Sequence, residues 1–125
     1  MSNIERARSF IEAWENRDVD AIVEAAANDI VYHNIPMEPV IGKDALRAAA
    51  APFLQMSERV VWETPHIAET ADGAVLTERL DHFHLAGGKT ISVRVMGVFE
   101  FDGDGKVSKW RDYFDLAEFQ SQMPG

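Results

Sequence analysis

Three charged residues in the second half of the chain share strand faces with large apolar side chains. Arg79 and Asp81 alternate in phase with Val75, Thr77, Phe83 and Leu85, and Asp112 alternates in phase with Trp110 and Phe114. Successive side chains of a strand point to opposite faces, so if the large apolar residues mark the interior, the three charges point into it. A buried charge is costly unless it is paired and hydrogen-bonded, and a guanidinium can serve two carboxylates with its planar fork of donors.

Such a cluster could carry out acid–base chemistry. Two carboxylates in one low-dielectric pocket cannot both ionise easily, so one keeps its proton and serves as an acid while the other serves as a base. Two simpler explanations stay open at this point. The charges could form a structural ion-pair cluster, or they could face solvent on a half-exposed sheet.

Other polar residues offer weaker signals. Tyr32 and Asn34, two residues apart and close to Pro36, could share one face of an extended segment, or could be turn and capping groups. His82 and His84 lie on one strand face, but no nearby carboxylate or third histidine completes a metal site. We therefore expect no metal.

Composition narrows the classes of function. The chain has 125 residues, a hydrophobic fraction of 46%, a formal net charge of −9 and no cysteine. This length predicts one domain over residues 1–125. The acidic balance disfavours nucleic acid and anionic membranes as partners, and the lack of thiols excludes disulfides and zinc–thiolate sites. Without a signal-like N-terminus or a long apolar stretch, we expect a soluble protein of the cytoplasm.

Helical periodicity predicts three helices in the first half of the chain, at about residues 3–16, 18–28 and 43–56. Ser2 or Asn3 is the expected N-cap of the first helix. Pro52 is expected to kink the third helix or end it early. A short strand is expected at residues 30–34, before an irregular stretch that contains two prolines.

The second half of the chain has the pattern of an antiparallel meander. Residues rich in Val, Ile, Thr and aromatics are separated by short glycine-containing turns, which predicts four strands at residues 59–69, 74–85, 90–101 and 106–114. A last helix is expected at residues 116–122. Helices followed by a curved antiparallel sheet indicate an α+β fold in which the helices cover one sheet face.

Five short motifs, in order along the chain, give a specific resemblance. They are Tyr-His-Asn-Ile-Pro at 32–36, Ile-Gly-Lys-Asp-Ala at 41–45, Thr-Glu-Arg-Leu-Asp at 77–81, Met-Gly-Val-Phe-Glu at 96–100 and Trp-Arg-Asp-Tyr-Phe-Asp at 110–115. Together they resemble the limonene-1,2-epoxide hydrolase family. The resemblance implies a cone-shaped α+β fold of the nuclear transport factor 2-like, cystatin-like type. In that fold three to four N-terminal and C-terminal helices wrap a curved antiparallel or mixed sheet, as in ketosteroid isomerase and polyketide cyclases.

The resemblance also implies an activity and a role for each site residue. Asp112 would activate water held by Tyr32 and Asn34, Asp81 would protonate the epoxide oxygen, and Arg79 would lie between the carboxylates. A small apolar epoxide would become a vicinal diol in one step, without cofactor or metal. The apolar walls of the substrate pocket would include Phe53, Phe83, Val93, Val95 and Phe114.

Two other functions are compatible with this fold, because fold does not determine function. One is an isomerase or polyketide cyclase that uses Asp112 or Asp81 as a base on a ketone. The other is a non-catalytic domain that binds apolar ligands. The resemblance further implies a homodimer, for which the outer sheet face offers a weak apolar patch of Trp62, Leu76, Leu80, Met96 and Val98.

Overall fold

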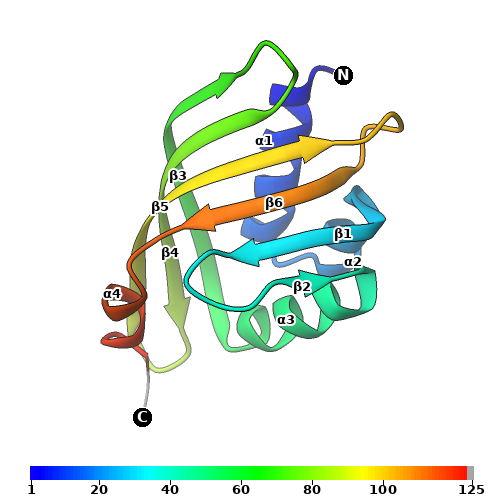
Figure 1. Cartoon of the computed structure of the whole chain (residues 1–125). Helices are drawn as coiled ribbons and strands as arrows, with labels where there is room; N and C mark the ends of the chain where they lie inside the picture. Colours follow the sequence, from blue (N-terminus) through cyan, green and yellow to red (C-terminus); the bar gives the residue numbers. More distant parts are fainter. Residues whose placement is uncertain (124–125) are drawn as a thin grey trace.

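The computed structural model describes residues 1–123 and contains four helices around one sheet. The helices are α1 (Asn3–Glu15), α2 (Val19–Ala25), α3 (Lys43–Gln55) and α4 (Leu116–Gln120). The strands are β1 (Ala26–Asn34), β2 (Val40–Ile41), β3 (Ser57–Glu69), β4 (Val75–Leu85), β5 (Thr90–Phe101) and β6 (Val107–Tyr113). Figure 1 shows α1 behind the curved sheet, α3 beside β2, and α4 beyond the end of β6. The predicted α+β fold is confirmed.

The sheet is mixed, with strand order β2-β1-β6-β5-β4-β3. Strands β3 to β6 form the predicted antiparallel meander, and β1 runs parallel to β6. The parallel register places Tyr32 beside Trp110 and Asn34 beside Asp112. Residues from the first and last thirds of the chain therefore share one sheet face at the ends of these two strands.

Side-chain caps in the local sequence explain where α1, α2 and α4 begin. The Ser2 hydroxyl accepts a hydrogen bond from the Glu5 backbone N–H at 3.1 Å, and the Glu5 carboxylate accepts one from the Ser2 N–H at 2.9 Å, which is a complete capping box. Asp18 caps α2 by accepting from the N–H of Ala21, and Asp115 caps α4. Each cap satisfies backbone donors that the first helical turn leaves free.

Two expectations about the first half of the chain were wrong. Helix α2 ends at Ala25, not near residue 28, because Ala26 is already extended and begins a β1 strand longer than the expected 30–34. Helix α3 spans Lys43–Gln55, close to the expected 43–56, so Pro52 does not end it early, and buried Leu54 lies in its last turn. A two-residue strand, β2, also lies within the stretch expected to be irregular, and it pairs with β1.

The core is rich in packed aromatic rings, and one of them, Trp62, does not belong to the outer apolar patch in which it was expected. Trp62 was expected on the outer sheet face, but its residue is only 5% exposed and its ring stacks on Trp14 at 5.1 Å. Trp62 pairs directly with Asp81 across β3 and β4, so both side chains lie on the inner face. Val60, two residues before Trp62, is buried on the same face, and register shifts with β4 lie on both sides of this pair.

Candidate active site

Arg79 lies at the centre of the buried charges and uses every N–H of its guanidinium. Nε and Nη2 donate to the two oxygens of Asp81 at 3.1 and 3.0 Å. Nη2 and Nη1 donate to Oδ2 and Oδ1 of Asp112 at 2.8 and 3.3 Å, and Nη1 also donates to Thr77 Oγ1 at 3.1 Å. The structure thus brings together the three charged residues singled out from the sequence. With five donors used, Arg79 has none left for a substrate.

Aromatic rings enclose the same guanidinium. Its Cζ lies 4.8 Å from the ring centroid of Trp62 and 5.8 Å from that of Phe99. These distances are those of cation–π interactions, and the two rings help to exclude water from the Arg79 side chain, which has no exposed surface. Arg79 therefore holds both carboxylates by hydrogen bonds and balances part of their charge.

Space for this cluster depends on Gly97, which the sequence analysis named only as part of the motif at residues 96–100. Gly97 on β5 pairs with Thr77 on one side and Asp112 on the other. A Cβ atom on Gly97 would overlap Arg79 Nη1 and would lie 2.5 Å from Asp112 Oδ1. A glycine inside a strand is the sequence signal of such a close approach, and it was available at this position.

Asp112 is held from a second side by a residue whose role the sequence reasoning also missed. The Trp110 indole Nε1–H donates to Asp112 Oδ1 at 2.8 Å, and both residues are buried on the inner face of β6. On the neighbouring strand, Asn34 Nδ2 donates to Tyr32 Oη at 3.0 Å, and Tyr32 Oη lies 3.3 Å from Asn34 Oδ1. The neutral pair Tyr32–Asn34 therefore lies next to Asp112.

The surroundings of these groups change their protonation. Burial raises the pKa of Asp81 to about 6, against the opposing effect of the Arg79 charge, and the nearby Asp112 adds to the increase. Burial alone would lower the pKa of Arg79, but Asp112 and Asp81 together raise it above its usual value. Burial, reinforced by the charge of Asp112, also raises the pKa of Tyr32, which stays a neutral hydroxyl. One carboxyl in the cluster is thus set up to hold a proton in mildly acidic solution, up to about pH 6.

A cavity of about 430 Å³ opens next to the cluster. Tyr32, Asn34, Asp81 and Asp112 line it, whereas Arg79 lies behind them. All five residues expected as apolar walls line it too, namely Phe53, Phe83, Val93, Val95 and Phe114. Further lining residues come from segments with no local signal of a pocket: Trp14, Met37, Glu38, Val40, Ala49, Trp62, Phe119 and Met123. The result is an apolar chamber with two carboxyl groups and a Tyr–Asn pair in its wall.

The two histidines considered as metal ligands have other partners. His82 contacts Ser92 Oγ at 2.7 Å and Glu63 Oε2 at 3.0 Å, and His84 contacts Thr90 Oγ1 at 3.0 Å. Within residues 1–123, no group of three or more potential ligand side chains is placed to hold a metal ion. None of the helices in this part of the chain is long and apolar enough to cross a membrane.

Comparison with known proteins places the chain in a family. The family model described as limonene-1,2-epoxide hydrolase catalytic domain matches residues 1–124. The epoxide hydrolase EphG of Mycobacterium tuberculosis is 38% identical over 111 residues, which cover 88% of this chain and 71% of that protein.

Solved structures agree with this placement. An LEH-like epoxide hydrolase from M. tuberculosis superposes with a TM-score of 0.78 and 32% identity, covering 96% of this chain and 87% of that one. A SnoaL-like polyketide cyclase from Shewanella denitrificans has a TM-score of 0.85 at 15% identity, covering 96% and 95% of the two chains, which is a likeness of fold alone. The chain belongs to the limonene-1,2-epoxide hydrolase family.

Proposed function

We propose that this protein is an epoxide hydrolase that converts a small apolar epoxide into a vicinal diol by direct attack of water. The observation that carries the proposal is the site itself. Two carboxyl groups joined by one arginine lie in the wall of an apolar cavity, beside a neutral Tyr–Asn pair. The relatives named as epoxide hydrolases support the same chemistry.

Asp112 and Asp81 take different roles because their surroundings differ. Asp112 accepts hydrogen bonds from Trp110 and from two nitrogens of Arg79, and it lies beside Asn34, a member of the pair proposed to hold the water. Asp81 accepts from Arg79 alone, and its pKa is raised to about 6. Asp112 is therefore the base and Asp81 the acid.

The reaction is one displacement with two proton transfers. In the proposed complex a water molecule is hydrogen-bonded to Tyr32 and Asn34, in place of the 3.3 Å contact between the oxygens of these two side chains. This water gives one proton to Asp112. Its oxygen forms a bond to an epoxide carbon while the bond from that carbon to the epoxide oxygen breaks. Asp81 protonates the departing oxygen. Exchange with solvent then returns a proton to Asp81 and removes one from Asp112, and ring strain helps to drive the opening.

The cavity selects for size and polarity. About 430 Å³ suits a compact terpene, cyclic or alkyl epoxide rather than a long chain, and most of the lining is aromatic or aliphatic. The positive charge of Arg79 is fully engaged inside the protein, and Glu38 is the charged residue that lines the cavity besides the two aspartates. An epoxide that carries a carboxylate is therefore a poor substrate.

The test is product analysis in ¹⁸O-labelled water with a terpene epoxide and a meso epoxide. We expect a diol that carries one ¹⁸O atom, formed with inversion at the attacked carbon. The variants Asp112→Asn and Asp81→Asn should abolish most of this reaction. Isomerised ketone products, or hydrogen exchange next to a ketone, would instead identify an isomerase or cyclase. Ligand binding without any turnover would identify a non-catalytic binding domain.

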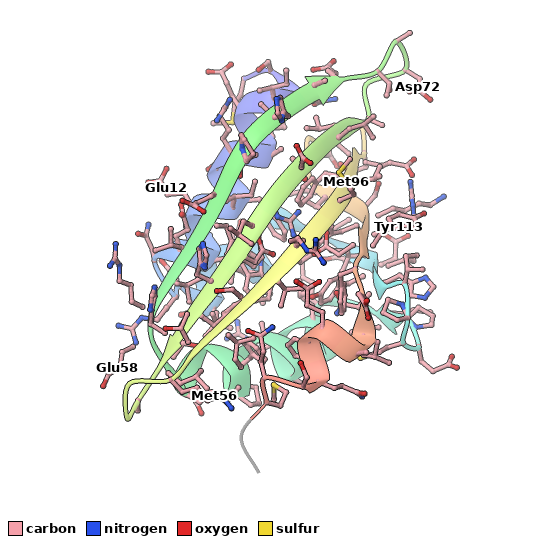
Figure 2. All side chains as sticks on the ribbon, turned by 90° about the vertical axis from the view of Figure 1, so that its left-hand side faces the viewer. Glu12, Met56, Glu58, Asp72, Met96 and Tyr113 are labelled. Carbon is pink, nitrogen blue, oxygen red and sulfur yellow. The ribbon has the colours of Figure 1, made fainter. Side chains whose placement is uncertain are left out.

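The active protein in this proposal is a homodimer of the cytoplasm. Leu76, Met96 and Tyr113 are exposed apolar residues of the outer sheet face, and Met96 is 52% exposed. Met96 pairs with Tyr113 across β5 and β6, and Figure 2 shows the two side chains close together. The test is sedimentation of the wild-type protein and of Met96→Glu, with a dimer expected for the first and a monomer for the second. A monomeric wild type would contradict this assembly.

A further inference from the structure

Trp110 contacts both halves of the proposed water-activating machinery. Its indole N–H donates to Asp112 Oδ1 at 2.8 Å. Its ring stacks on the ring of Tyr32, with centroids 4.1 Å apart and planes 13° apart. Tyr32 and Trp110 are register partners in the parallel pair of β1 and β6, and Asn34 and Asp112 are the next partners in phase. One side chain thus links the proposed base to the pair that holds the water.

The hydrogen bond from Trp110 distinguishes the two oxygens of Asp112. Oδ1 accepts from Trp110 Nε1 and from Arg79 Nη1, which occupies both of its lone pairs. Among the described residues, Oδ2 accepts one hydrogen bond, from Arg79 Nη2 at 2.8 Å. A lone pair therefore stays available on Oδ2, and this is the atom that can receive a proton from water.

Packing against neighbouring aromatic rings fixes the orientation of the Trp110 indole. It is completely buried, and it stacks on Phe99 with centroids 5.5 Å apart and planes 17° apart. The edges of Phe10 and Trp14 pack against it at 5.1 and 5.4 Å. A ring enclosed in this way cannot turn without disturbing the core, so the direction of its N–H is set by packing.

We propose that Trp110 is a positioning residue that directs Asp112 Oδ2 and the Tyr32 hydroxyl toward the same water. This inference rests on the proposed function, because the water is the one that attacks the epoxide. Trp110 touches neither substrate nor water and works through Asp112 and Tyr32. Removing its N–H frees one lone pair of Asp112 Oδ1 and lets the carboxylate rotate.

The chain supplies two internal comparisons for this indole. Trp14 and Trp62 are also buried in the core, but their Nε1 atoms have no hydrogen-bond partner among the described residues. The three indole N–H groups of the protein therefore differ in one respect that spectroscopy can follow: the N–H of Trp110 alone points to a carboxylate.

The first experiment needs no substrate. The three indoles are labelled with ¹⁵N, assigned through single Trp→Phe variants, and compared by NMR in wild type and Asp112→Asn. We expect the Trp110 indole proton resonance to move more than those of Trp14 and Trp62 when the carboxylate becomes an amide. A Trp110 resonance that moves no more than the other two would overturn the proposal, whatever the activity of the protein.

The second experiment measures kcat and KM for wild type, Trp110→Phe and the matched control Phe10→Leu. Phe10 is buried against Trp110 and does not line the cavity, and its variant keeps the indole N–H. In Trp110→Phe, loss of one hydrogen bond to a charged acceptor should lower kcat on the order of tenfold, with little change in KM. The kcat of Phe10→Leu should fall much less, because the hydrogen bond from Trp110 to Asp112 is still present. Equal losses of kcat in the two variants would overturn the proposal.

A double substitution separates a positioning role from general loosening of the core. If Trp110 acts through Asp112, then Trp110→Phe should cost almost nothing further in an Asp112→Asn background. Full additivity of the two effects would contradict this role. Should the wild type fail to hydrolyse any epoxide, the proposed function fails, while the NMR comparison still decides whether Trp110 holds Asp112.

Discussion

Raising the pH from 6 to 8 should slow the enzyme steeply, because Asp81 has to hold a proton before the epoxide can open. Burial raises the pKa of this carboxyl to about 6, even though Arg79 opposes the effect. About half of the free enzyme then holds the proton at pH 6, about one tenth at pH 7 and about one hundredth at pH 8. Since kcat/KM reports the ionisation of the free enzyme, it should fall about fiftyfold over these two pH units.

The assay is the initial rate of diol formation at substrate concentrations far below KM, in buffers of constant ionic strength. Asp81→Asn is the matched control, because its amide cannot protonate the leaving oxygen and does not titrate. Its small residual rate should lose the decline above pH 6. A wild-type kcat/KM that is flat or rising between pH 6 and 8 would refute the assignment of Asp81 as the acid.

Four further results are expected. Asp112→Asn should lower kcat by at least about 10²-fold with an unchanged circular dichroism spectrum; near-full activity would exclude it as the base. Gly97→Ala should lower kcat at least about tenfold, because its methyl group overlaps Arg79 and Asp112, and a crystal structure should show the guanidinium displaced. Dialysis against a strong chelator should leave the rate unchanged; loss restored by one metal would argue against the mechanism. Because the pKa of Asp81 is raised from 3.8 to about 6 on folding, its protonated form stabilises the folded protein by on the order of 3 kcal/mol below pH 3.8, and this contribution is lost as the pH rises through about 6. The free energy of unfolding in urea should therefore differ less between pH 4 and pH 7 in Asp81→Asn than in wild type.

Strand alternation indicated that three of the site residues could point inward, and the structure places them in the interior. Arg79, Asp81 and Asp112 share faces with large apolar side chains, and the glycine-containing turns fix where the long strands begin and end. Side-chain direction along a regular strand has a period of two, so this part of the fold is encoded locally. The expectation for Trp62 was wrong: it was assigned to the outer face, whereas it is buried and paired with Asp81 on the inner face.

The pairing of distant segments had no local signal. Asn34 lies beside Asp112 because β1 and β6 are parallel, and nothing within either strand specifies that partner. The start of β1 was also hidden, since its alanines continue the helical pattern of α2 until Ala26 becomes extended. The family resemblance supplied the grouping of Tyr32 and Asn34 with Asp112, which tertiary structure alone creates. Closer attention to neighbouring strand positions could have indicated the tight packing at Gly97 and the hydrogen bond from Trp110 to Asp112.

The most direct test of the central claim is a single turnover in ¹⁸O-labelled water with enzyme in excess over epoxide. If water attacks the epoxide carbon, the diol from this first turnover carries ¹⁸O at the inverted carbon, and the peptides that contain Asp112 and Asp81 stay unlabelled. A carboxylate nucleophile would instead transfer its own oxygen through an ester. An unlabelled first diol, with ¹⁸O gained by either aspartate peptide, would contradict direct attack by water.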